Sequence, residues 1–217
     1  MAAAVSHKPT RRELRDGSVI ELREVRRDDK GAIADGFARL SPESRYRRFF
    51  SSVDRLSPTD LAYLTEVDHH DHEAVVAFDP EGATVGVARY VRGDEPETAE
   101  VAVVVVDDWQ GRGAGTALLE RLTERASENG IKRFVALILQ ENAEALELFR
   151  SIDAETSGPK RTPDGYLELV VEVPPGPVPG TALGRALRTA AAGRVVIHPW
   201  RLIKDRLQAM QQNRPDR

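Results

Sequence analysis

A glycine-rich turn over residues 107–116 has the composition of a phosphate-binding site. It follows an apolar run with four consecutive valines and leads into an amphipathic stretch that predicts a helix. The first N–H groups of a helix have no intrahelical acceptor, and the helix dipole favours an anion there. The residues expected to hold the anion are Gln110, Gly111, Arg112, Gly113, Ala114, Gly115 and Thr116.

Particular residues exclude two other phosphate-binding motifs. A P-loop needs Lys followed by Ser or Thr after its last glycine, whereas Thr116 and Ala117 follow Gly115. A dinucleotide fingerprint needs a third glycine where Thr116 stands, and a regular βαβ context that this chain lacks. A turn with a purely structural role remains the alternative, because a glycine turn alone is a weak signal.

The elements around this turn predict an α+β sandwich in the order βααα-βββ-α-β-α-β. The four valines before the turn indicate a strand that is buried on both faces. Asp28-Asp29, Ser41-Pro42 and Ser57-Pro58 are typical helix starts. Strands are expected over residues 18–25, 73–78, 84–91, 98–106, 134–139 and 167–173, and the later helices over 113–129 and 142–152.

Two motifs in this arrangement resemble the GNAT superfamily of acyl-CoA N-acyltransferases. One is the turn Gln110-x-x-Gly113-x-Gly115, and the other is Asn142-x-x-Ala145 after the next strand. The resemblance covers residues 13–173 and implies a mixed, mostly antiparallel sheet flanked by helices, with acetyl-CoA as co-substrate and no metal. It also implies that the strand before the turn separates from the next strand to admit the pantetheine. The remaining contacts that it implies are Val104, Val105, Val106, Asn142, Ala145 and Phe149.

A narrower resemblance, to the bacterial Pat-type protein lysine acetyltransferases, is carried by residues 40–50, 67–74, 86–90 and 99–102. It implies transfer to the ε-amine of a protein lysine, for example on an acyl-CoA synthetase. Many of these enzymes carry a regulatory domain, for which this sequence leaves no room. A small-amine acetyltransferase and an acyl-CoA-binding module without catalysis remain the alternatives.

Amine acylation needs a base, and Glu100 is the candidate. It opens the strand before the turn, and the Pat-type resemblance places a catalytic glutamate there; burial would raise its pKa towards neutrality. The alternative is an exposed carboxylate at a sheet edge, paired with Arg89 or Arg92. Many GNAT enzymes protonate the departing thiolate with a tyrosine where this chain has Phe149. Tyr90 and Tyr166 are weaker substitutes.

The segment Asp68-His69-His70-Asp71-His72-Glu73 offers the side chains that bind metal ions. Consecutive residues cannot all face one ion, so we expect no metal there. The segment is expected to connect a helix to a strand and to form part of the acceptor rim, where His72 or Asp68 would orient the amine.

Composition limits the remaining possibilities. The 217 residues include no cysteine, which excludes disulfides and thiolate catalysis. No apolar run is long enough to cross a bilayer and no secretory signal is present, which fits a cytoplasmic protein. Net charge is −10 over residues 1–173, which argues against nucleic acid as a partner, and +6 over residues 174–217.

The chain is expected to have four parts. They are a flexible N-terminus (1–12), a GNAT domain (13–173), a Pro/Gly linker (174–180) and a basic amphipathic helical extension (181–217). The extension is too apolar for a free tail, so it is expected to pack on the body, on a second copy in a homodimer, or on a partner. A membrane-surface helix ranks below these arrangements.

Overall fold

The computed structural model describes residues 8–49, 54–139, 160–162 and 166–173. Their strands form one sheet in the order β1-β2-β3-β4-β5-β6-β8-β7. Every neighbouring pair is antiparallel except β5 and β6, which are parallel. The strands are β1 (Thr10–Glu13), β2 (Val19–Glu24), β3 (His72–Phe78), β4 (Thr84–Arg92), β5 (Thr98–Val105), β6 (Arg133–Leu139), β7 (Lys160–Arg161) and β8 (Tyr166–Glu172).

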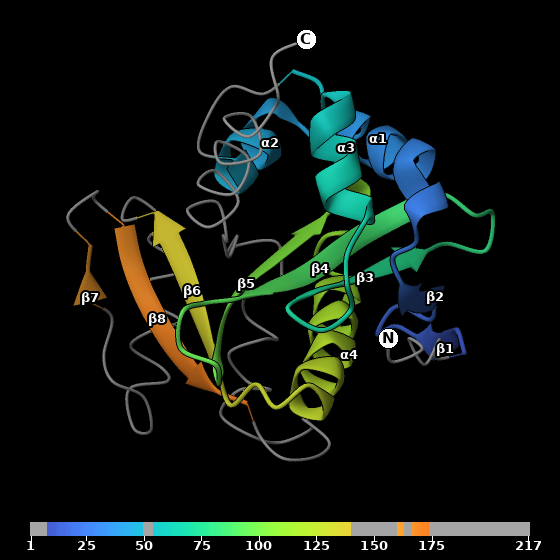
Figure 1. The fold of residues 1–217 in the computed structure, drawn as a ribbon. Coiled ribbons are helices and arrows are strands. Elements are labelled where there is room, and N and C mark those ends of the chain that lie inside the picture. The colour runs from blue at the N-terminus through green and yellow to red at the C-terminus, as the bar shows by residue number, and fades with distance from the viewer. Residues whose placement is uncertain (1–7, 50–53, 140–159, 163–165, 174–217) are drawn as a thin grey trace, which may run out of the picture.

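Helices cover both faces of this sheet, which confirms the expected fold class (Figure 1). Three helices lie on one face and α4 lies on the other. Ser57 begins α3 with a capping box, because its side chain accepts from Asp60 N while the Asp60 carboxylate accepts from Ser57 N. The helices are α1 (Lys30–Ala38), α2 (Pro42–Phe49), α3 (Pro58–Thr65) and α4 (Ala114–Glu128), with short 3-10 turns η1 (Arg27–Asp29) and η2 (Asp107–Trp109).

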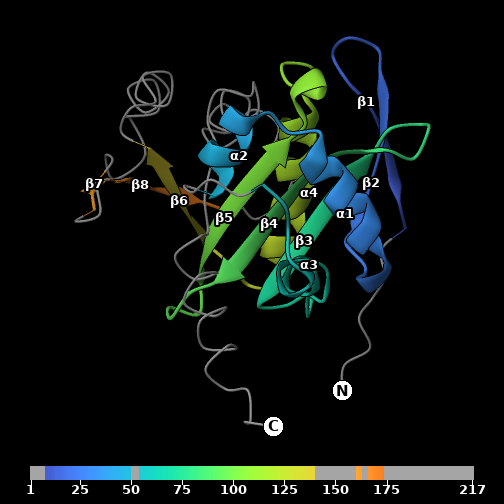
Figure 2. The same ribbon diagram turned by 90° about the horizontal axis from the view of Figure 1, so that it is seen from above.

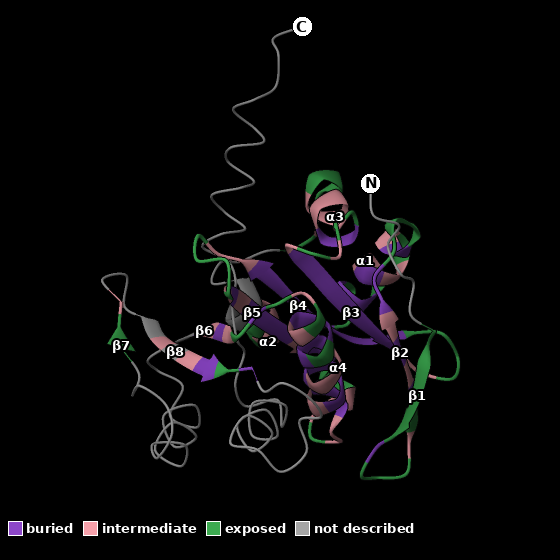
Figure 3. Cartoon of the chain, turned by 60° about the horizontal axis from the view of Figure 1, so that its bottom comes forward, coloured by how far each residue is buried: buried purple, intermediate pink, exposed green. Residues whose placement is uncertain are grey.

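The side chains of β5 alternate between the two faces of the sheet. Val101, Val103 and Val105 belong to the core beneath α4, whereas Val104 packs against the core beneath α1 and α3. The central strands are accordingly buried along most of their length (Figure 3). On the other face only Ala102 of β5 is buried, while Thr98, Glu100 and Val104 are half-buried. The prediction that β5 is buried is therefore confirmed for the face beneath α4 and wrong for most of the opposite face.

Two sequence predictions change at the ends of the chain. Residues 10–12 are not a flexible segment, because they pair with β2 as part of β1. The expected helix over 142–152, the linker over 174–180 and the extension over 181–217 lie outside the described residues. Among the helices that the structure describes, none has the length and apolar character needed to cross a membrane.

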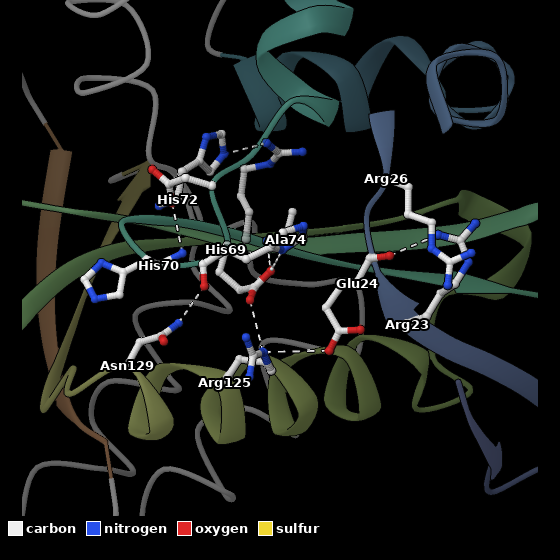
Figure 4. Close-up of polar contacts among 12 residues, drawn as sticks. Arg23, Glu24, Arg26, His69, His70, His72, Ala74, Arg125 and Asn129 are labelled. Carbon is white, nitrogen blue, oxygen red and sulfur yellow. Dashed lines mark hydrogen bonds and ion pairs between the residues drawn. The ribbon is translucent and has the colours of Figure 1, made fainter. Parts of the chain in front are cut away.

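A buried ion-pair network joins α4 to the sheet. Glu73 of β3 is fully buried, and its Oε2 lies 3.0 Å from Arg125 Nε of α4. Its other oxygen accepts a hydrogen bond from the N–H of Ala74. Glu24 of β2 extends the network, since its Oε1 lies 3.7 Å from Arg125 (Figure 4). The same oxygen lies 2.9 Å from Arg121. These contacts fix α4 across β2 and β3.

The histidine-rich segment before β3 is tied to the C-terminal end of the same helix. His69 Nδ1 lies 2.8 Å from Glu73 Oε1, and this hydrogen bond raises the pKa of His69 because it stabilises the charged imidazole. The His69 carbonyl accepts from Asn129 (Figure 4). The His70 carbonyl accepts from the Tyr90 hydroxyl. The segment is therefore an anchored connection between α3 and β3.

We predict that Arg125→Met destabilises the fold by about 3 kcal/mol, because it leaves the Oε2 atom of the buried Glu73 carboxylate without its guanidinium partner. Lys132→Met is the control, since Lys132 pairs with Glu97 while their side chains are 65% and 52% exposed. That surface pair should cost under about 1 kcal/mol. Urea unfolding measures both, and a loss below about 1 kcal/mol for Arg125→Met would contradict the importance of the network.

Candidate active site

Strands β5 and β6 pair at one end only. The parallel ladder joins residues Thr98, Ala99 and Glu100 to β6, and it ends at the pair Glu100–Val135. Beyond this point β5 continues to Val105 and the two strands diverge (Figure 1). The separation that the GNAT resemblance implied is therefore present, with Glu100 at its closed end.

The register of β5 decides which of its backbone groups face this separation. Val106 N donates to Val85 O of the β4 side at 2.9 Å. Backbone groups in an antiparallel pair alternate in direction, so the N–H of Val104 also points to β4, opposite Val87. The N–H groups of Val103 and Val105 point to the other side, from which β6 has diverged. Of the predicted backbone contacts Val104, Val105 and Val106, only Val105 has this direction.

The glycine turn lies at the open end of the separated strands and leads into α4. Gly111 and Gly113 have φ angles of +76° and +104°, which side chains with a Cβ rarely adopt. No side chain caps the N-terminus of α4 at Gly113, and its first turn has no acidic residue. Ala114 and Gly115 are buried, so the approach to the first-turn N–H groups is through the turn itself. This combination suits an anion.

Other predicted turn residues have clear positions. The Gln110 side-chain amide donates to the carbonyl of Val105 at 3.1 Å, so it joins the turn to the end of β5. The guanidinium of Arg112 lies 4.9 Å from the centre of the Trp109 ring. The Thr116 hydroxyl oxygen is buried and has no hydrogen-bond partner in the part of the chain that the structure describes.

Asp107 fastens the start of the turn to the segment that begins α2. Its carboxylate accepts hydrogen bonds from the Ser41 backbone N–H, the Ser41 hydroxyl and the Ser44 hydroxyl. Burial alone would raise the pKa of Asp107, but these hydrogen bonds hold it below its usual range. The Asp107 carboxylate is thus bound to Ser41 and Ser44.

Glu100 is not an exposed carboxylate at a sheet edge. Its strand lies between β4 and β6, the residue is half-buried, and its Oε2 atom is buried. The two arginines proposed as alternative partners have other bonds. Arg92 binds Asp71 Oδ1 at 2.7 Å, and Arg89 binds His72 and the Leu64 carbonyl. The prediction of an exposed position at a sheet edge is therefore wrong.

A buried arginine lies on the same face of the sheet as Glu100. Arg89 of β4 pairs with Ala102, two residues along β5 from Glu100. Its guanidinium donates to His72 Nε2 at 3.0 Å and to the Leu64 carbonyl at 3.2 Å. Burial lowers the pKa of Arg89 to about 10, so the group still carries its charge at neutral pH.

The contact with Arg89 determines the protonation state of His72. A guanidinium only donates hydrogen bonds, so His72 Nε2 accepts and the imidazole is neutral with its proton on Nδ1. The imidazole also lies 4.8 Å from the ring of Tyr63. Sequence reasoning considered Arg89 only as a partner of Glu100. The signal that it missed is an arginine in the middle of an otherwise apolar strand.

An apolar cavity lies on this face between the helices and the strands β4 and β5. Its lining includes Ile33 and Phe37 of α1, Leu64 of α3, Val104 of β5, and Arg89 as the charged group. Because Val104 also belongs to β5, the cavity adjoins the strand that carries Glu100. The cavity and Glu100 therefore lie on the same face of the sheet, opposite α4.

The remaining predicted site residues divide into three groups. Asp68 accepts from the N–H groups of residues 70–72, and no group of three potential metal ligands occurs within the described ranges. The Tyr90 side chain belongs to the core beneath α4, away from the face that carries Arg89, and burial raises its pKa. Outside the described residues lie Asn142, Ala145 and Phe149, and the side chain of Tyr166 is not described either.

Comparisons with known proteins agree with this geometry. The sequence model of the Acetyltransferase (GNAT) family matches residues 38–153. Acetyltransferase Pat of Mycolicibacterium smegmatis is 34% identical over 177 residues, which are 81% of this chain and 51% of that protein. This chain therefore spans about half the length of that relative.

Two further matches cover different shares of this chain. The crystal structure of the GNAT domain of S. lividans PAT has a TM-score of 0.67 and 33% identity, and covers 76% of this chain and 96% of that one. An L-methionine sulfoximine/L-methionine sulfone acetyltransferase of Pseudomonas aeruginosa is 34% identical over 114 residues, covering 47% and 64% of the two chains. The family model matches more than half of this chain, and the structure has the glycine turn and the separated strands. This chain therefore belongs to the GNAT family of acetyltransferases.

Proposed function

We propose that this chain transfers an acetyl group from acetyl-CoA directly to the ε-amine of a protein lysine. The observation that carries the proposal is the position of Glu100 where β5 and β6 separate. The glycine turn is at the other end of the same strand. A phosphate site and a carboxylate at opposite ends of one strand fit a cofactor that runs along it from pyrophosphate to thioester.

The backbone of β5 supports the polar contacts that such a cofactor needs. The N–H groups of Val103 and Val105 point towards the separation, where they can donate to pantetheine amides or to the thioester oxygen. A fixed N–H donor stabilises the negative charge that develops on that oxygen during attack. The turn of Gly111 and Gly113, together with Arg112, would bind the pyrophosphate.

The reaction itself needs one proton acceptor. The amine nitrogen attacks the acetyl carbon, the new carbon–nitrogen bond forms, the carbon–sulfur bond breaks, and its electron pair leaves on sulfur. Glu100 removes the proton that nitrogen loses. The CoA thiolate leaves as an anion and takes a proton from water. Direct transfer agrees with a sequence that has no cysteine to form a thioester intermediate.

The breadth of the similarities favours a protein lysine as the acceptor. Similarity to Pat extends over 81% of this chain, whereas similarity to the amino-acid-type acetyltransferase extends over 47%. Proteins of the Pat type, which the sequence resembles, act on lysines of acyl-CoA synthetases. A small amine is the second candidate acceptor, since the L-methionine sulfoximine/L-methionine sulfone acetyltransferase is 34% identical to this chain in the matched part.

An acceptor panel tests the proposal. CoA release is measured with an acyl-CoA synthetase, with L-methionine sulfone, and with no acceptor. We expect release above background only with the synthetase, together with acetylation of one of its lysines by mass spectrometry. Release with the sulfone alone would favour the small-amine function. Binding of acetyl-CoA without release in any arm would indicate a binding module.

We predict that Glu100→Gln lowers kcat about a hundredfold and leaves the Kd for acetyl-CoA within about twofold. The activity of this variant should rise with pH, because more of the acceptor amine is then already deprotonated. Glu97→Gln is the matched control, since Glu97 is exposed, lies three residues away and loses the same charge. Equal kcat for wild type and Glu100→Gln at neutral pH would exclude Glu100 as the base.

A further inference from the structure

The tip of the β1–β2 hairpin lies against the glycine turn. Arg15 N donates to the carbonyl of Arg112 at 3.4 Å, and the Arg15 Cγ lies 3.8 Å from the position that a Cβ on Gly113 would occupy. Leu14 is buried in the core beneath α4 and fixes the hairpin there. Figure 2 shows this hairpin beside the N-terminal end of α4. A second segment of the chain therefore borders the phosphate site.

At the contact between the hairpin and the glycine turn, one acidic side chain lies beside a basic one. Asp16 accepts from the Ser18 hydroxyl at 2.5 Å and from the Ser18 N–H at 3.0 Å. Its carboxylate also lies 3.6 Å from Arg112 Nε. These hydrogen bonds, and then the Arg112 charge, lower the pKa of Asp16, so it stays ionised at neutral pH. Asp16 therefore offsets the charge of Arg112.

Arg15 supplies a positive charge at this junction that Asp16 does not offset. It is exposed, and its guanidinium has no hydrogen bond or ion pair with any residue that the structure describes. This exposed guanidinium belongs to a side chain that lies beside Gly113, at the uncapped N-terminus of α4. It therefore adds positive potential where a phosphate would lie. An arginine guanidinium can also donate two parallel hydrogen bonds to two oxygens of one phosphate.

We infer that Arg15 is a phosphate-binding residue for CoA, contributed by the β1–β2 hairpin from outside the glycine-turn motif. The inference rests on the proposed function, because it takes CoA as the ligand. The shared chemistry is a phosphate group, which belongs to the pyrophosphate or to the 3′-phosphate of the adenosine. Arg112 lies between Asp16 and the Trp109 ring, whereas the Arg15 side chain lies on the Gly113 side of the turn.

The test is the affinity of the full chain for CoA and for dephospho-CoA, which lacks the 3′-phosphate, measured by calorimetry. We expect Arg15→Ala to weaken CoA binding about tenfold, as for the loss of one charge-assisted hydrogen bond. Arg27→Ala is the charge-matched control, because Arg27 is exposed and lies beyond the opposite end of β2 from the hairpin. Arg27→Ala should bind CoA within about twofold of wild type.

The two ligands identify the phosphate. An equal loss for CoA and dephospho-CoA assigns Arg15 to the pyrophosphate, and a loss for CoA alone assigns it to the 3′-phosphate. Unchanged affinity of Arg15→Ala for both compounds, or an equal loss in Arg27→Ala, would overturn the inference while leaving the proposed function intact. Failure of the wild type to bind either compound would overturn both.

Discussion

The site depends on the end of pairing between β5 and β6 at Glu100. A strand inside a sheet normally has both of its backbone edges bonded to neighbours. Here β5 keeps β4 on one edge along its length but loses β6 after three residues. The backbone groups of Val103 and Val105 are thereby directed into the separation. An extended ligand with amide groups can take the place of the missing strand.

This opening is useful only if the helix that follows β5 is held in place. α4 crosses the sheet and is fixed by the contacts of Arg125 with Glu73 and Glu24. Gln110 joins the glycine turn to the carbonyl of Val105, and Asp107 joins it to Ser41 and Ser44. The glycine turn therefore has a defined position relative to β5. The charged groups that hold α4 lie away from its N-terminus, which leaves the helix dipole available for an anion.

The sequence predicts the parts of this arrangement that depend on local signals. The four valines, the glycine turn and the cap at Ser57 each have a pattern within a few residues. β1 could not be found this way, because Thr10–Glu13 are all exposed and show no apolar alternation. Its strand geometry depends on pairing with β2. The position of Arg89 within an apolar strand could be seen in the sequence, but its partners His72 and Leu64 are brought together only by the fold.

The direction of the backbone N–H groups of β5 is a further feature that the sequence could not predict. The GNAT resemblance implied Val104–Val106 as contacts of the cofactor. Which of these residues point into the separation depends on the register with β4, and a shift by one residue reverses the answer. Glu100 was identified by its position in the strand and by resemblance. Its place at the end of the β5–β6 ladder could be known only from the sheet.

Residue-resolved amide hydrogen exchange, with and without saturating acetyl-CoA, tests most directly whether β5 receives the cofactor along its open edge. We expect bound cofactor to slow exchange at Val103, Val105 and residues 111–116. Exchange at Val104 should be slow in both states, because its N–H already faces β4. Bound acetyl-CoA that leaves Val103, Val105 and the turn unchanged would contradict the account.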